Sequence, residues 1–325
     1  MRFFKLFLLL LTPILLNACG GGSSGSAGGA ASFSVPSCTD SGTRDAEYFF
    51  TGSYGDGGHG LTRICASAAY DRGATGAGIK IAVLDSGVST DDSGAVNLTD
   101  LDDNVVSFTS GSDLIGSDSV PNDEQGHGTH VAGLIAAENN NDGGHHGVAY
   151  EADLFIYKVL NDNNRTVGNS VANGINKARG DGVDIMNLSL GDFGTIGSNC
   201  NSASSCETYL GSFGYSALEA AGAANIILVW SAGNDSNSNP SVSSGAAIYD
   251  DDFKETTVIA VAIGLNGKLA SAANGDPGWT TGSNACGIAA AICIAAPGTA
   301  LFSEKNDDND FLVRKSGTSM AAPMV

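Results

Sequence analysis

The stretch Ile79–Gly87, IKIAVLDSG, is an apolar, β-branched run that leads directly into a carboxylate and a tight turn. A run of this kind predicts a strand that is buried on both faces of a sheet. Four further runs have the same character: 153–160, 183–190, 226–230 and 256–262. Helical patterns lie between them at 130–138, 170–180 and 209–223. Because strands and helices alternate, we expect a three-layer α/β domain whose mostly parallel sheet is covered by helices on both faces.

Two candidate functional side chains follow from this sheet. Ligands bind beyond the carboxyl ends of parallel strands, and Asp85 directly follows the first run. A lone Asp-Ser-Gly is weak evidence, because Asp and Gly are common turn residues. The second candidate is His127 in EQGHGTHVAGLIAA (124–137), where Gly126 and Gly128 leave the imidazole uncrowded at the start of a helix. A histidine there can exchange protons near neutral pH, although it could equally cap the helix or bind a metal.

A third candidate is Ser319 in GTSMAAP (317–323). Gly317 and Thr318 are small enough to let a substrate backbone approach, and a helix that begins at Ser319 would favour developing negative charge there. A serine before a helix is also a common N-cap. Helix capping alone does not explain why GTSMAAP occurs together with the segments around Asp85 and His127.

Asp85, HGTHVAG and GTSMAAP together resemble the subtilisin-like serine proteases (subtilases, peptidase S8 family), in which the triad has the chain order Asp, His, Ser. The resemblance extends from about Ala68 to the last residue. It implies a serine endopeptidase in which Ser319 attacks the scissile carbonyl to form an acyl-enzyme. His127 would transfer the protons and Asp85 would orient the imidazole.

The same resemblance assigns residues that bind the substrate. Asn234 in VWSAGNDS matches the asparagine of the oxyanion hole. Ser189, Leu190 and Gly191 in MNLSLG resemble the segment that pairs with an extended substrate backbone, so we expect protein or peptide substrates and a broad sequence preference. The resemblance implies that no cofactor is required for the chemistry.

Two other functional classes stay open. A surface binding module that has kept the fold but lost catalysis would show a broken triad, whereas none of the three residues is missing. A metal-dependent hydrolase could use His127 and His130, which are three residues apart on a helix, with His145 and His146 completing the site. The chain lacks HExxH and the other common zinc-binding patterns.

The N-terminal segment resembles an export signal. Arg2 and Lys5 precede the apolar run 7–16, which is shorter than a membrane-spanning helix. Residues 16–19, LNAC, resemble the lipobox of bacterial lipoproteins, which implies a signal peptide over 1–18 and a lipid on Cys19. The alternative is an ordinary signal peptide with a stray thiol.

Two further segments complete the expected organisation. Residues 19–45 form a Gly/Ser-rich tether, and 46–325 form the catalytic domain. Residues 67–87 and 286–299 resemble subtilisin-like passengers of Gram-negative autotransporters, some of which are lipoproteins. This implies a protein that is anchored in the outer membrane, displayed at the cell surface or secreted, with a membrane barrel beyond this chain. In the family the helix of Ser319 continues for several turns, so we expect the domain to be C-terminally incomplete, poorly stable and weakly active or inactive.

The seven cysteines predict disulfides, which an oxidising compartment permits. A lipidated Cys19 leaves six. Pairing in sequence order is the simplest arrangement, although the sequence alone allows 15 connectivities. The pairs would be Cys38 with Cys65, Cys200 with Cys206, and Cys286 with Cys293.

The composition indicates a strongly acidic globular protein, with a formal net charge of −20. It has no basic stripe that could neutralise phosphates, so we expect no nucleic-acid partner. The acidity predicts either a soluble, repulsive surface or a structural calcium ion. No run has EF-hand spacing, and the sequence assigns no calcium ligands.

Overall fold

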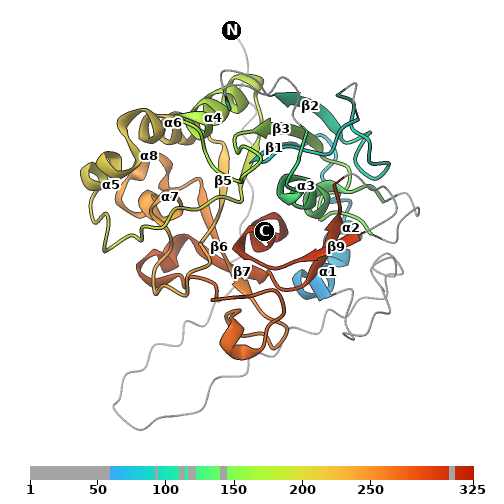
Figure 1. Ribbon diagram of the computed structural model, residues 1–325. Helices are drawn as coiled ribbons and strands as arrows, with labels where there is room; N and C mark the ends of the chain where they lie inside the picture. The colour runs from blue at the N-terminus through green and yellow to red at the C-terminus, as the bar shows by residue number, and fades with distance from the viewer. Residues whose placement is uncertain (1–58, 92–93, 110–113, 116–121, 140–144, 307–311) are drawn as a thin grey trace, which may run out of the picture. The chain divides into compact units, whose positions relative to one another are not determined.

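The computed structural model describes residues 59–325 except 92–93, 110–113, 116–121, 140–144 and 307–311 (Figure 1). The expected signal peptide, Cys19, the tether and Cys38 lie outside these residues. None of the helices in the described ranges is long and apolar enough to cross a membrane.

Seven strands form one sheet in the order β2-β3-β1-β4-β5-β6-β7. Every neighbouring pair is parallel, so the predicted parallel sheet is confirmed. Five strands coincide with the predicted runs, whereas β2 and β7 were not predicted. Their bounds are β1 Lys80–Asp85, β2 Val105–Thr109, β3 Asp153–Lys158, β4 Ile185–Leu188, β5 Ile227–Ser231, β6 Thr257–Ile263 and β7 Cys293–Pro297.

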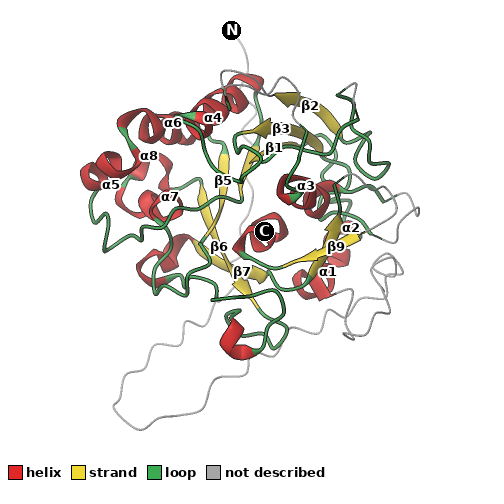
Figure 2. Ribbon diagram, in the orientation of Figure 1, coloured by secondary structure: helices red, strands yellow, loops and turns green. Residues whose placement is uncertain are grey.

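The sheet has a hydrophobic core on each face, because successive side chains of a strand point to opposite sides. In β1, Ala82 and Leu84 belong to one core, and Ile81 and Val83 belong to the other. The first core is covered by α4 (Ser170–Asp181) and α6 (Ser212–Ala223). The second is covered by α3 (His127–Ala136) and α9 (Thr318–Ala321). Figures 1 and 2 show these two helical layers on opposite sides of the sheet.

An antiparallel hairpin packs on α3. Strands β8 (Leu301–Glu304) and β9 (Leu312–Lys315) pair with each other. The imidazole Nε2 of His130 lies 3.2 Å from the Leu301 carbonyl and 3.1 Å from the Val313 carbonyl, and Ser303 Oγ donates to the His130 carbonyl at 2.7 Å. Because both of its partners are acceptors, Nε2 carries the hydrogen. His130 therefore clamps the hairpin to the helix.

The remaining helices are short. One prediction was wrong: the expected helix over 209–223 is two helices that are separated at Gly211, which has φ +78°. A left-handed φ of this kind interrupts a helix and favours glycine. The other bounds are α1 His59–Ile64, α2 Ala66–Tyr70, α5 Ala203–Leu210, α7 Val242–Gly245, η2 Ala246–Tyr249, α8 Asp251–Lys254, η3 Ala272–Asn274, η4 Gly287–Ile292 and η5 Ala322–Met324.

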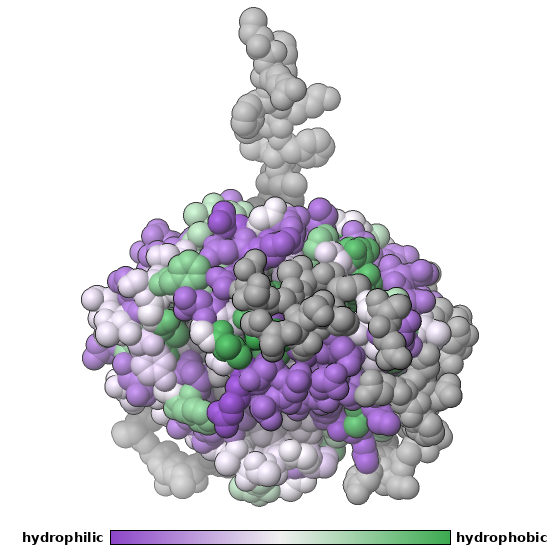
Figure 3. Space-filling view, turned by 45° about the horizontal axis from the view of Figure 1, so that its top comes forward, coloured by the Kyte–Doolittle hydropathy of each residue, from purple (hydrophilic) through white to green (hydrophobic). Residues whose placement is uncertain are grey.

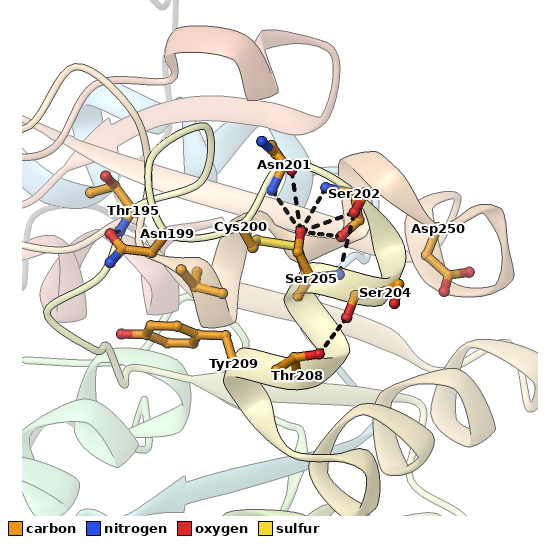
Figure 4. Close-up of a disulfide and its surroundings, with 12 residues drawn as sticks. Thr195, Asn199, Cys200, Asn201, Ser202, Ser204, Ser205, Thr208, Tyr209 and Asp250 are labelled. Atoms are coloured by element: carbon orange, nitrogen blue, oxygen red, sulfur yellow. Dashed lines mark hydrogen bonds between the residues drawn. A yellow bond between two sulfur atoms is a disulfide. The ribbon is translucent and has the colours of Figure 1, made fainter.

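Local disulfides link short loops, as the sequence order of the cysteines suggests. Cys200 is bonded to Cys206 beside the capped start of α5, where Ser202 Oγ accepts from the Ser205 backbone N–H (Figure 4). Cys286 is bonded to Cys293. Cys65 is also disulfide-bonded. Its expected partner lies outside the described part of the chain.

The surface agrees with the acidic composition. The side of the protein that Figure 3 shows is largely hydrophilic, with apolar side chains scattered over it. The formal net charge of the full sequence is −20.

Candidate active site

Three elements bring the predicted triad residues to one end of the sheet. Asp85 is the last residue of β1, His127 is the first residue of α3, and Ser319 is the second residue of α9. Asp85 Oδ1 lies 2.7 Å from His127 Nδ1. A carboxylate can only accept, so Nδ1 carries the hydrogen and the neutral imidazole keeps a lone pair on Nε2. His127 is therefore prepared to act as a base through Nε2.

Opposing effects set the pKa of His127. Burial lowers the pKa, but the negative charge of Asp85 and its hydrogen bond outweigh burial, so the pKa lies above the usual 6.5. The ammonium of Lys315 lowers this pKa, and the carboxylate of Asp123 raises it. Asp85 thus stabilises the imidazolium that forms when His127 takes a proton.

Glycines allow α3 to start where it does. Gly126, the N-cap, has φ +77°. A Cβ at Gly128 would lie 2.3 Å from the Gly87 carbonyl oxygen and 3.1 Å from Asp85 Cβ. The missing side chain at Gly128 therefore lets His127 approach the end of β1.

Asp123 organises this approach, and the sequence did not single it out. Its side chain is fully buried. Oδ1 accepts from Ser86 Oγ and from the backbone N–H groups of Gln125 and Gly126 at 2.8–3.1 Å. Oδ2 accepts from the N–H and Oγ1 of Thr129 at 2.8 and 2.7 Å. One carboxylate thus joins the turn after β1 to the first turn of α3. In the sequence, the feature that could have identified Asp123 is its position four residues before His127.

Ser319 is held against the end of β4. Its Oγ donates to the Ser189 carbonyl at 3.2 Å, and Ser189 Oγ donates to the Ser319 carbonyl at 2.8 Å. Among the hydrogen bonds of the described chain, none joins Ser319 to His127. Catalytic hydrogen bonds commonly tighten only when substrate is bound.

The side-chain amide of Asn234 is oriented by Thr318. It follows Gly233, which has φ +103°, and its side chain is exposed. Its Oδ1 accepts from the N–H and Oγ1 of Thr318, both at 2.9 Å. Because the oxygen is fixed by these two donors, the amide NH₂ is left to donate.

Six of the predicted residues line one cavity of about 1010 Å³: His127, Ser189, Leu190, Gly191, Asn234 and Ser319. A neighbouring pocket of about 240 Å³ shares Leu190 and Gly191 and is lined by Val171, Leu218 and Trp230. The larger cavity can hold a peptide segment, and the smaller one can hold an apolar side chain.

The four histidines of the metal hypothesis do not converge. His130 is bonded to two carbonyls of the β8–β9 hairpin. His146 packs edge-on against Tyr70 and Tyr150, and His145 lies 4.0 Å from Glu304. In the ranges that the structure describes, no group of three or more His, Cys, Asp or Glu residues could hold a metal ion. The described residues therefore give no support to a metal site built on these histidines.

Comparison with known proteins identifies the family of this chain. The model of the subtilase family, Peptidase_S8, matches residues 76–325. Subtilisin DY of Bacillus licheniformis is 30% identical over 269 residues, which is 82% of this chain and 81% of that protein. Subtilisin BL of Lederbergia lenta is 40% identical over 132 residues, or 41% of this chain, and the match spans only 44% of that relative's length. The solved structure of the prenylagaramide maturation protease PagA superposes with a TM-score of 0.58 at 21% identity, covering 80% and 76% of the two chains, and shows the shared fold. The chain belongs to the subtilase family.

Proposed function

We propose that this protein is a serine endopeptidase that hydrolyses peptide bonds through Asp85, His127 and Ser319. The observation that carries the proposal is the 2.7 Å contact between Asp85 and His127 beside a cavity that Ser319 also lines. This contact fixes the tautomer that a general base needs, and the cavity gives a peptide access to the serine.

In this mechanism, the substrate backbone lies along Ser189–Gly191. Ser319 Oγ leaves the Ser189 carbonyl and turns toward His127 Nε2. It attacks the scissile carbonyl carbon, so that a C–O bond forms and the hydroxyl proton passes to Nε2. Asp85 stabilises the resulting imidazolium, and the NH₂ group of Asn234 donates to the oxyanion.

The tetrahedral intermediate then collapses. The C–N bond breaks, and His127 gives its proton to the leaving amine, which leaves an acyl group on Ser319. A water molecule gives a proton to His127 and attacks the acyl carbonyl. The second collapse releases the new carboxyl end and returns the proton to Ser319.

We also propose that the protein is exported and anchored at the outer membrane of a Gram-negative bacterium. The support is the sequence of residues 1–18, the lipobox-like cysteine at position 19, and the resemblance to lipoprotein autotransporter passengers. A Cys19→Ser variant is expected to lose incorporation of labelled fatty acid and to leave the membrane fraction. Unchanged fractionation and labelling would contradict lipidation.

The test of the chemistry is labelling with a fluorophosphonate, an electrophile that reacts with an activated serine. We expect one adduct, mapped by mass spectrometry to Ser319 and absent from Ser319→Ala and His127→Ala. A His127→Ala protein that still labels at full rate would contradict the role of His127. A folded wild-type protein without an adduct would favour the binding module instead.

A further inference from the structure

The substrate cavity carries positive charge on a protein that is strongly acidic. The chain has 15 Lys and Arg residues against 35 Asp and Glu residues. Arg165, Arg314 and Lys315 all line the cavity that contains Ser319. Two carboxylates also line it, Asp192 and Asp235. Asp192 is engaged by backbone N–H groups, including that of Ser243 at 2.7 Å.

Lys315 differs from its neighbours because its charge has no direct partner among the residues that the structure describes. It is half-buried, and its ammonium makes no hydrogen bond or ion pair within the described ranges. The guanidinium of Arg314, by contrast, lies over the Phe302 ring at 5.3 Å. The buried Lys158 donates to the Asn122 carbonyl at 2.6 Å and to Asp162 at 3.0 Å. A half-buried cation without a partner is costly, so a bound anion is favoured beside it.

The carboxylates of Asp123 and Asp85, whose charges act on Lys315, already accept hydrogen bonds from other groups. Burial lowers the pKa of Lys315, and the charges of Asp123 and Asp85 raise it without reversing that shift. Asp123 accepts five hydrogen bonds from other groups, and Asp85 accepts from His127 and from the Ser86 N–H. Asp85 Oδ2 is buried without a hydrogen-bond partner, and neither carboxylate bonds to Lys315 within the described ranges.

The position of Lys315 identifies the part of a substrate that it faces. It is the last residue of β9, in the hairpin that His130 clamps to α3, and its charge acts on His127. The segment that starts at Ser189 contacts Ser319 from the end of β4 instead. His127 protonates the leaving amine, so the residues after the scissile bond lie on the side of α3 and β9.

We propose that Lys315 is a specificity-determining residue that binds a carboxylate on the leaving-group side of the scissile bond. The carboxylate is either an Asp or Glu side chain directly after that bond or a free C-terminus close to it. This inference rests on the proposed peptidase function and adds a substrate class to it.

The experiment compares kcat/KM for internally quenched peptides. Two C-terminally amidated peptides have Glu or Gln directly after the scissile bond. A third has Gln there and a free carboxylate two residues further on. We expect the Glu peptide to be cleaved about tenfold better than its Gln partner at low salt, with a smaller ratio at high salt. The ratio should fall to about one in Lys315→Met and below one in Lys315→Glu.

Lys268→Met is the matched control, because it removes an exposed lysine that does not line the cavity and should keep the wild-type ratio. An advantage confined to the third peptide assigns the C-terminal carboxylate as the ligand. Equal cleavage of all three peptides, or a ratio that Lys315→Met does not change, overturns the assignment while the peptidase function stands. Cleavage that persists in Ser319→Ala, or no cleavage of any peptide, overturns the proposed function and this inference with it.

Discussion

Ser189 and Ser319 exchange two hydrogen bonds, each hydroxyl donating to the other residue's carbonyl, at 2.8 and 3.2 Å. The pair joins the end of β4 to the first turn of α9. Asn187 Nδ2 donates to Ser189 Oγ at 2.9 Å and holds that hydroxyl in place. The Ser319 hydroxyl thus has a defined resting position on an acceptor that cannot take its proton. In the proposed mechanism, it rotates toward His127 to become the nucleophile.

Replacing Asn234 with Ala should lower kcat by about 10²- to 10³-fold and change KM little, a magnitude established on a subtilisin itself. The reason is that its NH₂ group would donate to charge that develops only in the transition state. Steady-state kinetics on one peptide measure the split. Asn266→Ala is the control, since the hydrogen bond of the Asn266 side chain in the described chain is one that it accepts from the Lys268 N–H, in a turn after β6. A rise in KM at constant kcat would show that Asn234 binds the ground state.

Gly128→Ala should lower activity by about 10²-fold or more and stability by about 1–3 kcal/mol. The new Cβ would lie 2.3 Å from the Gly87 carbonyl, so the start of α3 and the end of β1 must move apart. In the matched control Gly180→Ala, nothing lies within 4 Å of the new Cβ in α4. We expect this variant to keep its activity and to gain up to about 1 kcal/mol. Thermal unfolding and peptide cleavage of both proteins provide the comparison, and equal behaviour would refute the packing argument.

Asp123→Asn should lower both the stability and the pH midpoint of kcat/KM. An amide NH₂ would face donors that now bond to a carboxylate, at a cost of about 2 kcal/mol or more. In the proposed mechanism, activity requires neutral His127, so we expect it to rise with pH through a midpoint above 6.5 in the wild type. Because Asp123 raises the pKa of His127, its loss shifts that midpoint down. Asp251→Asn, with a side chain that is 96% exposed, should leave both quantities unchanged. An unshifted midpoint would limit Asp123 to a structural role.

Glu304→Gln should stabilise the protein increasingly as pH rises. Burial, and secondly the charge of Asp100, raise the pKa of Glu304 to about 8, whereas burial lowers the pKa of His145 to about 3. The two side chains are 4.0 Å apart, but with these pKa values they are both neutral near pH 6. A carboxyl with a raised folded pKa contributes stability below its unfolded pKa of 4.5 and loses it as pH rises toward 8. Wild type should therefore weaken relative to the Gln variant by up to about 1.4 kcal/mol per pH unit in this window. Urea unfolding at pH 5 and pH 8 measures the difference, and a constant gap would contradict it.

The sequence predicted those parts of the fold that depend on short local patterns. Five buried strands and the positions of Asp85 and His127 follow from apolar runs and the residues next to them. The break at Gly211 was missed because the apolar periodicity continues across it, and only the backbone dihedral interrupts the helix. The β8–β9 hairpin is anchored by His130, a contact across more than 170 residues that no local pattern records.

The same limit applies to the candidate site. Asp123 and Lys315 belong to none of the sequence motifs that indicated the site. Their proposed roles depend on groups that other helices and strands place beside them. Ser319 was a candidate from its local sequence, and Asn234 and Ser189 were located by resemblance, but the reciprocal bonding of the two serines required the packed structure.

The distribution of the site over β1, α3 and α9 also determines when activity can arise. Asp85 and Ser319 are 234 positions apart in the chain (319 − 85). Contacts of such long sequence separation form late and slowly. A chain that is exported from its N-terminus, as proposed, delivers Asp85 and His127 well before Ser319. In the proposed mechanism, the exported chain therefore gains hydrolytic activity only when α9 docks, which protects the machinery that secretes it.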